Sequence, residues 1–421
     1  MVDPAEPAPS GGVPLLVVGY PVQWERARFD ASTRAVWASA EASLGMLMDA
    51  MQRGGNSTEV ARRFEFAVDS TAALAARLDA IAPVEEPWRL PPPVPVHSDY
   101  FRVRHTPLTP HQQAAQTAVA VFRTLADLRL TMLEINDVLA EVASMSLLFR
   151  LLRPASAGGT NGSTPDGPPV DVPAGPPPTQ PAAPNGSAGT AAPNGTAAGT
   201  AAPNGTAADM AAPDNLAESA AAYRPDGDWM DRWFLVHHYY FVLNVYAAAL
   251  IHRAVEHTRA GADGPAAAAL ADAAVLIRGF TAAMIHSGAM PAKYYQDVVR
   301  PTMSPPYVPI NLTGVMQIEH RRYRAAVEEL ITAVPEPYAD LMLTRPELAD
   351  ARDEVLEADL LDLERHITLA AVLVGGERSL VQPGTTTQNA TSTLRKMRHM
   401  RAANYCPLMQ FGDRWLTRMS R

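Results

Sequence analysis

Residues 229–258 read WMDRWFLVHHYYFVLNVYAAALIHRAVEHT, and this stretch decides the fold. No charged residue occurs between Trp233 and Ile251. The only polar groups in that interval belong to His237, His238, Asn244 and the tyrosine hydroxyls. A helix that is apolar on every side belongs in the interior of a protein. The stretch therefore predicts a long buried helix.

Other stretches outside this helix also have helical spacing, with apolar residues recurring at three and four positions. Thr109 or Thr106 is suited to cap the start of one of them, because a threonine hydroxyl can accept a hydrogen bond from a free backbone N–H. No stretch shows a convincing strand alternation, so the predicted fold class is all-α, with room for a minor sheet at the N-terminus. The expected helices are Thr33–Met51, Asn56–Ile81, Pro110–Leu152 and Asp353–Val374.

The segment 154–222 consists almost entirely of Ala, Pro, Gly, Thr, Asn and Ser, and it contains near-repeats of AAPNG. Such a segment has too little apolar surface to offset the entropy lost on ordering. We therefore expect a long disordered insertion. It would separate an N-terminal helical region, residues 1–153, that contributes to the core from a helical catalytic domain, residues 223–421.

Composition excludes several functional classes. The formal net charge is −9, which gives no basic surface for nucleic acid or an anionic membrane. A single cysteine, Cys406, excludes a disulfide framework and thiolate metal sites. The N-terminus is acidic and proline-rich, and no uninterrupted apolar run is long enough to span a membrane. We expect a cytoplasmic protein whose oligomeric state is open.

The histidines in the buried helix are the first candidates for chemistry. His237 shares a helix face with Trp233, whereas His238 lies on the next face. Burial favours the neutral imidazole. From the residues alone, a core histidine with one hydrogen bond is the more common situation, and the sequence does not decide which of the two faces a ligand.

A second candidate lies in MPAKYYQDVVRPTMSPP, residues 290–306. Arg300 precedes Pro301, so a helix is expected to end close to it. An arginine beside Tyr294 and Tyr295 could bind a carboxylate in bidentate fashion. The alternative is a surface arginine that stabilises the end of a helix.

The C-terminal part supplies a third candidate. His366 lies in the apolar half of an expected helix that ends at Gly375, and it could ligate a metal while its other nitrogen donates to residue 362. A lone histidine is weak evidence for such a role. A loop beginning at Gly384 and a basic helix containing Arg395 follow. The basic helix is either a solvated face or a partner for acidic groups such as porphyrin propionates.

In this order, these features resemble the haem domain of the indoleamine 2,3-dioxygenase and tryptophan 2,3-dioxygenase superfamily. They are most similar to the branch that contains the pyrrolnitrin-pathway (monodechloroaminopyrrolnitrin synthase-like) enzyme. The resemblance covers roughly half of the chain, from about Tyr223 to Ala402. The matching segments are WFLVH (233–237), KYYQDVVRP (293–301), PYVPINLTG (306–314), VPEPYADLM (334–342), His366 and GTTTQNATSTLRKMRHMRA (384–402).

The resemblance implies a b-type haem with His366 as the proximal ligand of its iron. It places Trp233 and His237 on the opposite, distal side, and Arg300 at the substrate carboxylate. It also implies that Tyr295, Trp233 and Thr386 contact the substrate, and that Trp233, Gly384, Thr385 and Arg395 contact the cofactor. The sequence departs from the dioxygenase pattern in two places. The loop has Thr385-Thr386 where those enzymes have two glycines, and His237 replaces a small distal residue of the indoleamine enzymes.

The reaction implied is insertion of oxygen from O2 into tryptophan, a tryptophan derivative or a related aromatic amino acid, in specialised metabolism. Pyrrolnitrin-type ring rearrangement and aromatic hydroxylation at the same haem are alternatives. A non-catalytic haem sensor or a helical interaction protein is the rival from another class. The expected partner is a small aromatic amino acid, not nucleic acid or a membrane.

Overall fold

The computed structural model describes residues 15–155, 229–375 and 390–417. The fold is all-α with one small sheet, as predicted. All of the described residues belong to a single compact unit. The expected insertion, residues 154–222, falls almost entirely outside the described residues. The helices of the N-terminal part are α1 (Ala31–Gln52), α2 (Ser57–Ile81), α3 (Pro95–Tyr100), α4 (Pro110–Leu128) and α5 (Ile135–Leu151), with the 3-10 turn η1 (Pro87–Arg89) before α3.

The C-terminal part begins with the two long helices α7 (Trp229–Arg259) and α8 (Asp263–Ser287). A continuous helical segment, α9 (Ala292–Tyr294), η2 (Tyr295–Val299) and α10 (Arg300–Thr302), follows them, and η2 is a π-helical turn. The remaining elements are η3 (Gly314–Met316), α11 (Ile318–Ala333), α12 (Tyr338–Thr344), α13 (Pro346–Val374), α14 (Ala390–Tyr405), η4 (Cys406–Leu408) and α15 (Gly412–Thr417).

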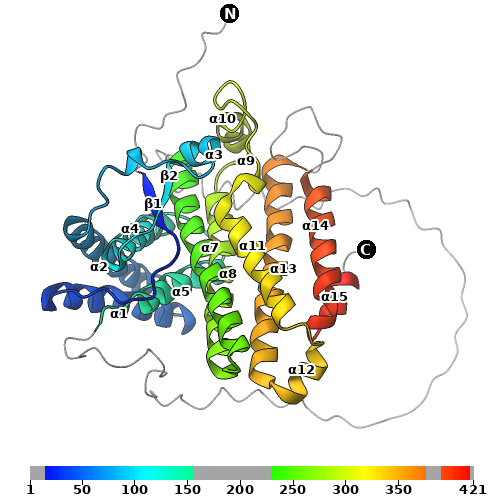
Figure 1. Cartoon of the computed structure of the whole chain (residues 1–421). Coiled ribbons are helices and arrows are strands. Elements are labelled where there is room, and N and C mark those ends of the chain that lie inside the picture. The colour runs from blue at the N-terminus through cyan, green and yellow to red at the C-terminus, as the bar shows by residue number, and fades with distance from the viewer. Residues whose placement is uncertain (1–14, 156–228, 376–389, 418–421) are drawn as a thin grey trace, which may run out of the picture. The chain divides into compact units, whose positions relative to one another are not determined.

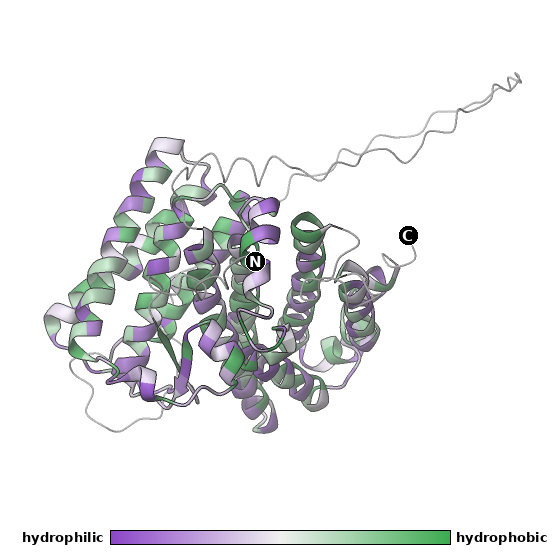
Figure 2. Ribbon diagram, turned by 90° about the horizontal axis from the view of Figure 1, so that it is seen from above, coloured by the Kyte–Doolittle hydropathy of each residue, from purple (hydrophilic) through white to green (hydrophobic). Residues whose placement is uncertain are grey.

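Helix α7 is buried as its composition predicted. It packs against α8, α11 and α4, and α8 in turn packs against α13 and α5 (Figure 1). Both α7 and α8 are long and apolar enough to cross a membrane, but 78% and 61% of their most apolar windows are buried inside the protein. Most other helices carry both hydrophilic and hydrophobic residues, coloured purple and green in Figure 2. This distribution is typical of core helices surrounded by amphipathic ones.

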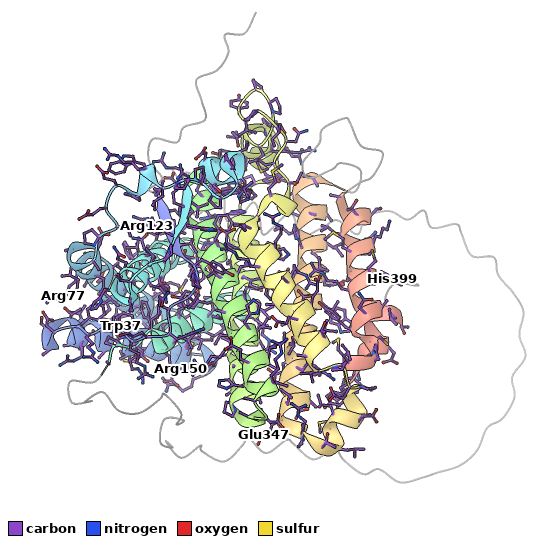
Figure 3. All side chains as sticks on the ribbon, in the orientation of Figure 1. Trp37, Arg77, Arg123, Arg150, Glu347 and His399 are labelled. Atoms are coloured by element: carbon purple, nitrogen blue, oxygen red, sulfur yellow. The ribbon has the colours of Figure 1, made fainter. Side chains whose placement is uncertain are left out.

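Polar side chains cap two helices of the N-terminal part, and of the two candidates for the start of α4 the cap is Thr109. The Asn56 side chain accepts from the Glu59 N–H at the start of α2, and Thr109 forms a capping box with Gln112 at the start of α4. The expected minor sheet is present: β1 (Leu16–Gly19) pairs in parallel with β2 (Val103–Thr106). Trp37 of α1, labelled in Figure 3, is fully buried in the same apolar core as α7.

Two helix boundaries differ from the prediction. The single helix expected over Pro110–Leu152 is broken between Leu128 and Ile135, although this stretch has no Gly or Pro. The Thr131 hydroxyl donates to the Leu128 carbonyl there, which offers the backbone an alternative to helical bonding. The break lets α4 pack on α2 and α7 while α5 packs on α1 and α8. Helix α13 also begins earlier than expected, at Pro346, a residue suited to the first helical position.

Candidate active site

A cavity of about 210 Å³ lies between α7, α8 and α13 and is also lined by residues of α3 and of the segment 303–317. Its walls are mainly aromatic and aliphatic, with a few polar side chains, which is typical of a small-molecule or cofactor site. The lining residues are His97, Phe101, Trp233, Val236, His237, Tyr240, Phe241, Ala283, Met284, Ser287, Tyr295, Met303, Leu312, Thr313, Gly314, Gln317, His366, Leu369, Ala370 and Leu373.

His366 lies on the α13 wall of the cavity. Leu369, Ala370 and Leu373 of the same helix also line the cavity. Burial lowers the pKa of His366 to about 4, and the Arg401 charge lowers it further, so the imidazole is neutral. Neither ring nitrogen has a hydrogen-bond partner among the described residues. A neutral imidazole with a free nitrogen on an apolar cavity is suited to bind a haem iron.

The expected hydrogen bond between His366 and residue 362 is not formed. Asp362 accepts a hydrogen bond from the Thr281 hydroxyl instead, at 3.1 Å between Oγ1 and Oδ1. Burial, reinforced by the nearby Asp359 charge, raises the pKa of Asp362 to about 7. The sequence could not show this, because α8, which carries Thr281, packs against α13 only in the tertiary structure.

His237 lies on the α7 wall of the same cavity. Its Nδ1 is 2.5 Å from the Trp233 carbonyl, so Nδ1 carries the proton and Nε2 is an acceptor. Phe101 stacks on the imidazole with ring centroids 4.8 Å apart. Burial lowers the pKa of His237 to about 3.

His238 does not line the cavity. It is buried, with its Nε2 2.6 Å from the Phe101 carbonyl. The structure therefore resolves a question that helix periodicity left open: of these adjacent histidines, His237 is the one that faces the cavity. His238 is a core histidine with one hydrogen bond.

Trp233 and Tyr295 lie beside His237 on the cavity wall. Their rings are 5.7 Å apart between centroids, and the Trp233 ring is 4.1 Å from that of His237. Burial raises the pKa of Tyr295 to about 12, although the Arg300 charge acts in the opposite direction. Arg300 is thus close to this wall and is itself buried, but it is not a lining residue.

Of the other predicted cofactor and substrate contacts, the structure describes only Arg395. Arg395 is exposed on α14 and does not line the cavity. Gly384, Thr385 and Thr386 lie outside the described residues. The buried face of the basic helix meets acidic residues of α13: Arg398 pairs with Glu364, and Arg401 pairs with Asp359 at 3.1 Å.

Several residues of the cavity carry no signal of this role in the sequence. His97 and Phe101 come from α3 and the residue after it, in the N-terminal part where the resemblance extends only to helical character. Thr313 and Gln317 come from the short segment before α11. A histidine in a short Pro-rich segment carries no periodic signal, so only packing reveals its role.

A buried network of charges lies behind the α8 wall. His286 of α8 is completely buried, with Nε2 2.9 Å from Asp127 of α4 and Nδ1 3.0 Å from Glu141 of α5. Arg232 of α7 pairs with Asp127 at 2.7 Å. Burial alone would lower the pKa of His286, but the carboxylates of Glu141 and Asp127 raise it to about 9. The imidazolium therefore joins the N-terminal helices to the helices of the cavity.

No group of three or more His, Cys, Asp or Glu side chains in residues 15–155, 229–375 and 390–417 is arranged to hold a bare metal ion. The candidate ligand of the cavity is a single imidazole.

Comparison with known proteins gives one family. A family model described as SfmD 3-methyl-L-tyrosine peroxygenase matches residues 31–351. The matched residues include Trp233, His237, Tyr295 and Arg300 but end before His366. A solved structure described as the crystal structure of reduced SfmD, soaked with sodium hydrosulfite, is 18% identical and covers 83% of this chain and 97% of that one, with a TM-score of 0.44. No curated protein sequence matches.

Proposed function

Because the chain belongs to the SfmD 3-methyl-L-tyrosine peroxygenase family, we propose that it is a haem-dependent peroxygenase of a phenolic amino acid. The family match confirms the resemblance to the indoleamine and tryptophan dioxygenase-like haem superfamily. The observation that carries the proposal is the convergence of His366 and His237, from α13 and α7, on one mainly apolar cavity.

The proposed reaction is hydroxylation of the aromatic ring. One oxygen atom of hydrogen peroxide replaces a ring hydrogen, and the other leaves as water, so that Ar–H and H2O2 give Ar–OH and H2O. The sequence resemblance alone suggested O2 and tryptophan. The family description instead favours a peroxide as the oxidant and a tyrosine derivative as the substrate, and we propose this pair. O2 as the oxidant and tryptophan as the substrate form the alternative to be tested. We also propose that the enzyme acts in specialised metabolism in the cytoplasm.

His366 would hold the iron of a b-type haem on the α13 side. Its neutral imidazole has a nitrogen available, and the apolar neighbours Leu369, Ala370 and Leu373 suit a porphyrin face. When bound, the haem would supply the oxygen-transfer chemistry, and the protein supplies position and polarity.

His237 is the proposed acid–base residue. With Nδ1–H donating to the Trp233 carbonyl, its Nε2 lone pair accepts a proton from the incoming peroxide and returns it to the departing water oxygen. The rings of Phe101 and Trp233 pack against the His237 imidazole and fix its orientation. The low pKa keeps the imidazole in the basic form at neutral pH.

The substrate ring is placed near Trp233 and Tyr295, whose rings form one wall of the cavity. We propose that Arg300, buried behind Tyr295, attracts the substrate carboxylate to this side. Because Arg300 does not line the cavity, its guanidinium would attract the carboxylate through its electrostatic field, or would bind it after a movement of the side chain. We assign no cofactor contact to Arg395, which is exposed.

Reconstitution with hemin tests the proposal directly. The wild-type protein is expected to give a Soret band that shifts with carbon monoxide, and His366→Ala is expected to lose stable haem while retaining its helical circular dichroism. His399→Ala is the matched control, because His399 is an exposed histidine on α14 (Figure 3). A wild-type protein that ignores hemin, or full haem retention by His366→Ala, would contradict the assignment.

The oxidant and substrate can be separated in the same preparation. Anaerobic incubation with hydrogen peroxide and 3-methyl-L-tyrosine should give a product heavier by one oxygen atom. Aerobic incubation with a reductant and tryptophan should give none. The reverse pattern, detected by mass spectrometry, would favour the dioxygenase reaction.

A further inference from the structure

The segment before α11 presents two polar side chains to the cavity. Gln317 lines it and is only 9% exposed, and its amide Nε2 is buried without a hydrogen-bond partner. The hydroxyl of Thr313, one helical turn earlier, is also buried without a partner in the described part of the chain. Gly314, which follows Thr313, lines the cavity as well.

Unpartnered buried donors are rare, because a buried donor without a partner loses the hydrogen bonds that it made to water in the unfolded chain. An amide that points into a ligand cavity recovers a hydrogen bond when the ligand offers an acceptor atom. Gln317 therefore indicates that the occupant of the cavity presents an oxygen on this side. Binding sites that hydrogen-bond a hydroxyl discriminate strongly against analogues that lack it, because their own polar groups would then be left unpaired.

The surrounding charges decide between a charged and a neutral oxygen. Glu319, two residues beyond Gln317, is 1% exposed and pairs with His105 at 2.6 Å between Oε1 and Nε2. Its negative charge extends to the cavity wall, since it raises the pKa of His97 against the stronger effect of burial, which lowers that pKa to about 4. Two groups act on His97 in the opposite direction: His105, the partner of Glu319, and Arg321, which is exposed to solvent. A ligand carboxylate would be repelled here by Glu319, whereas a neutral hydroxyl would not.

His97 supplies the complementary acceptor. It lines the cavity from α3, and its ring contacts Phe101 at 4.8 Å and Phe241 at 5.9 Å between centroids. A hydroxyl group both donates and accepts, so it can satisfy an amide donor and an imidazole acceptor at once.

We propose that Gln317, Thr313 and His97 form a subsite that binds the phenolic hydroxyl of the substrate and so selects phenols over phenylalanine. Gln317 donates to the phenolic oxygen and His97 accepts the phenolic proton. The proposal rests on the proposed function, because it specifies which end of the aromatic amino acid lies on this side of the cavity.

Calorimetry on the haem-loaded protein tests the subsite with three probes. L-Tyrosine carries both the hydroxyl and the carboxylate, L-phenylalanine lacks the hydroxyl, and tyramine lacks the carboxylate. The wild-type protein should bind tyrosine at least tenfold more tightly than phenylalanine. Gln317→Leu should reduce that ratio by about tenfold, the equivalent of one hydrogen bond, and leave the tyrosine-to-tyramine ratio unchanged.

Two further variants keep the test decisive. Thr313→Val, a nearly isosteric change, should lower the tyrosine-to-phenylalanine ratio by a smaller factor even if Gln317→Leu folds poorly. Gln410→Leu makes the same chemical change at an exposed position and should leave both ratios as in the wild type.

Several results would overturn the subsite. The first is a wild-type protein that binds tyrosine and phenylalanine equally or binds neither. The second is a Gln317→Leu variant whose tyrosine-to-phenylalanine ratio is unchanged. The others are a Gln317→Leu variant that loses the tyrosine-to-tyramine ratio instead, or one that loses only haem. The last two would assign Gln317 to a carboxylate of the substrate or of the cofactor. Failure of the proposed function is read separately, from the absence of a Soret band in the wild type.

Discussion

At the scale of single residues, the site depends on which imidazoles are neutral. His97, His237 and His366 all line the cavity, and burial lowers the pKa of each to about 3 or 4. His286, just behind the cavity, has the opposite shift because it contacts two carboxylates. The surroundings of each histidine therefore determine its charge. The three neutral imidazoles can bind a metal or accept a proton, whereas the charged His286 holds helices together.

His237 gives the first prediction. His237→Ala should lower kcat/KM for peroxide by about 10²–10⁴-fold, the usual contribution of a general base, without loss of haem. Because the pKa of His237 is about 3, wild-type activity should not decline between pH 8 and pH 5 through this group and should fall only as the pH approaches 3. The measurement is the initial rate against pH, with His399→Ala as the control.

A decline centred near pH 6.5 that disappears in His237→Ala would show that the imidazole is solvated. It would then not be the buried base described here.

At the scale of elements, helices α5 and α8 meet at Gly279. A Cβ on Gly279 would lie 2.3 Å from the Cβ and Oγ of Ser144, whose hydroxyl bonds Tyr239 of α7 at 2.7 Å. The clash is with an atom bonded directly to the backbone, so the helices themselves must move apart. This glycine sets the helix spacing of the core beside the cavity.

The second prediction follows from this contact. Gly279→Ala should destabilise the protein by about 1–3 kcal/mol through overpacking. Gly264→Ala, in the same helix, meets no atom within 4 Å and should be neutral or stabilising by about 0.5–1 kcal/mol. Urea unfolding of both variants measures the difference, and equal stabilities would refute the close contact.

The third prediction concerns the network that joins α4, α5, α7 and α8. The pKa of His286 is raised to about 9 from an ordinary value of about 6.5. The stability that it contributes is therefore fully present below about pH 6.5 and is lost as the pH rises through 9. The urea midpoint should fall over this interval.

His286→Gln should abolish that slope and lower stability by about 3–5 kcal/mol at neutral pH, because Asp127 and Glu141 would lose their buried cation. His399→Gln should keep the wild-type slope. A wild-type midpoint that rises between pH 6.5 and pH 9 would contradict the charge state assigned to His286.

At the scale of the whole molecule, the N-terminal helices and the cavity helices belong to one compact unit. His97 and Phe101 bring the N-terminal part to the cavity itself, and the His286 network joins it to α8. We propose that residues 1–153 and 223–421 act as one catalytic body and that residues 154–222 are an insertion between them.

The fourth prediction tests this organisation. Deleting Gly158–Ala212 should leave haem content unchanged and shift the melting temperature by less than about 2 °C, because the composition of this segment offers little apolar surface to bury. Haem content by absorbance and Tm by circular dichroism are the measurements. A loss of cofactor would show that the segment packs on the site.

The sequence by itself determined the all-α class, the buried α7 and the set of residues that share a helix face with His366 on α13. These are local properties: a run without charges must be buried, and a periodicity of three to four residues fixes which side chains share a helix face. Residue types and their order also led to the haem superfamily and to His366, His237, Trp233 and Tyr295. These four residues come together at one cavity.

Only the tertiary structure decided the features that depend on a neighbouring element. The break between α4 and α5, the partner of Asp362 on α8 and the choice of His237 over His238 follow from packing between helices distant in sequence. His97 and Gln317 became visible as site residues for the same reason. A side chain's exposure to a cavity is set by what packs on the other side of it, and the periodicity of its own segment contains no information about that.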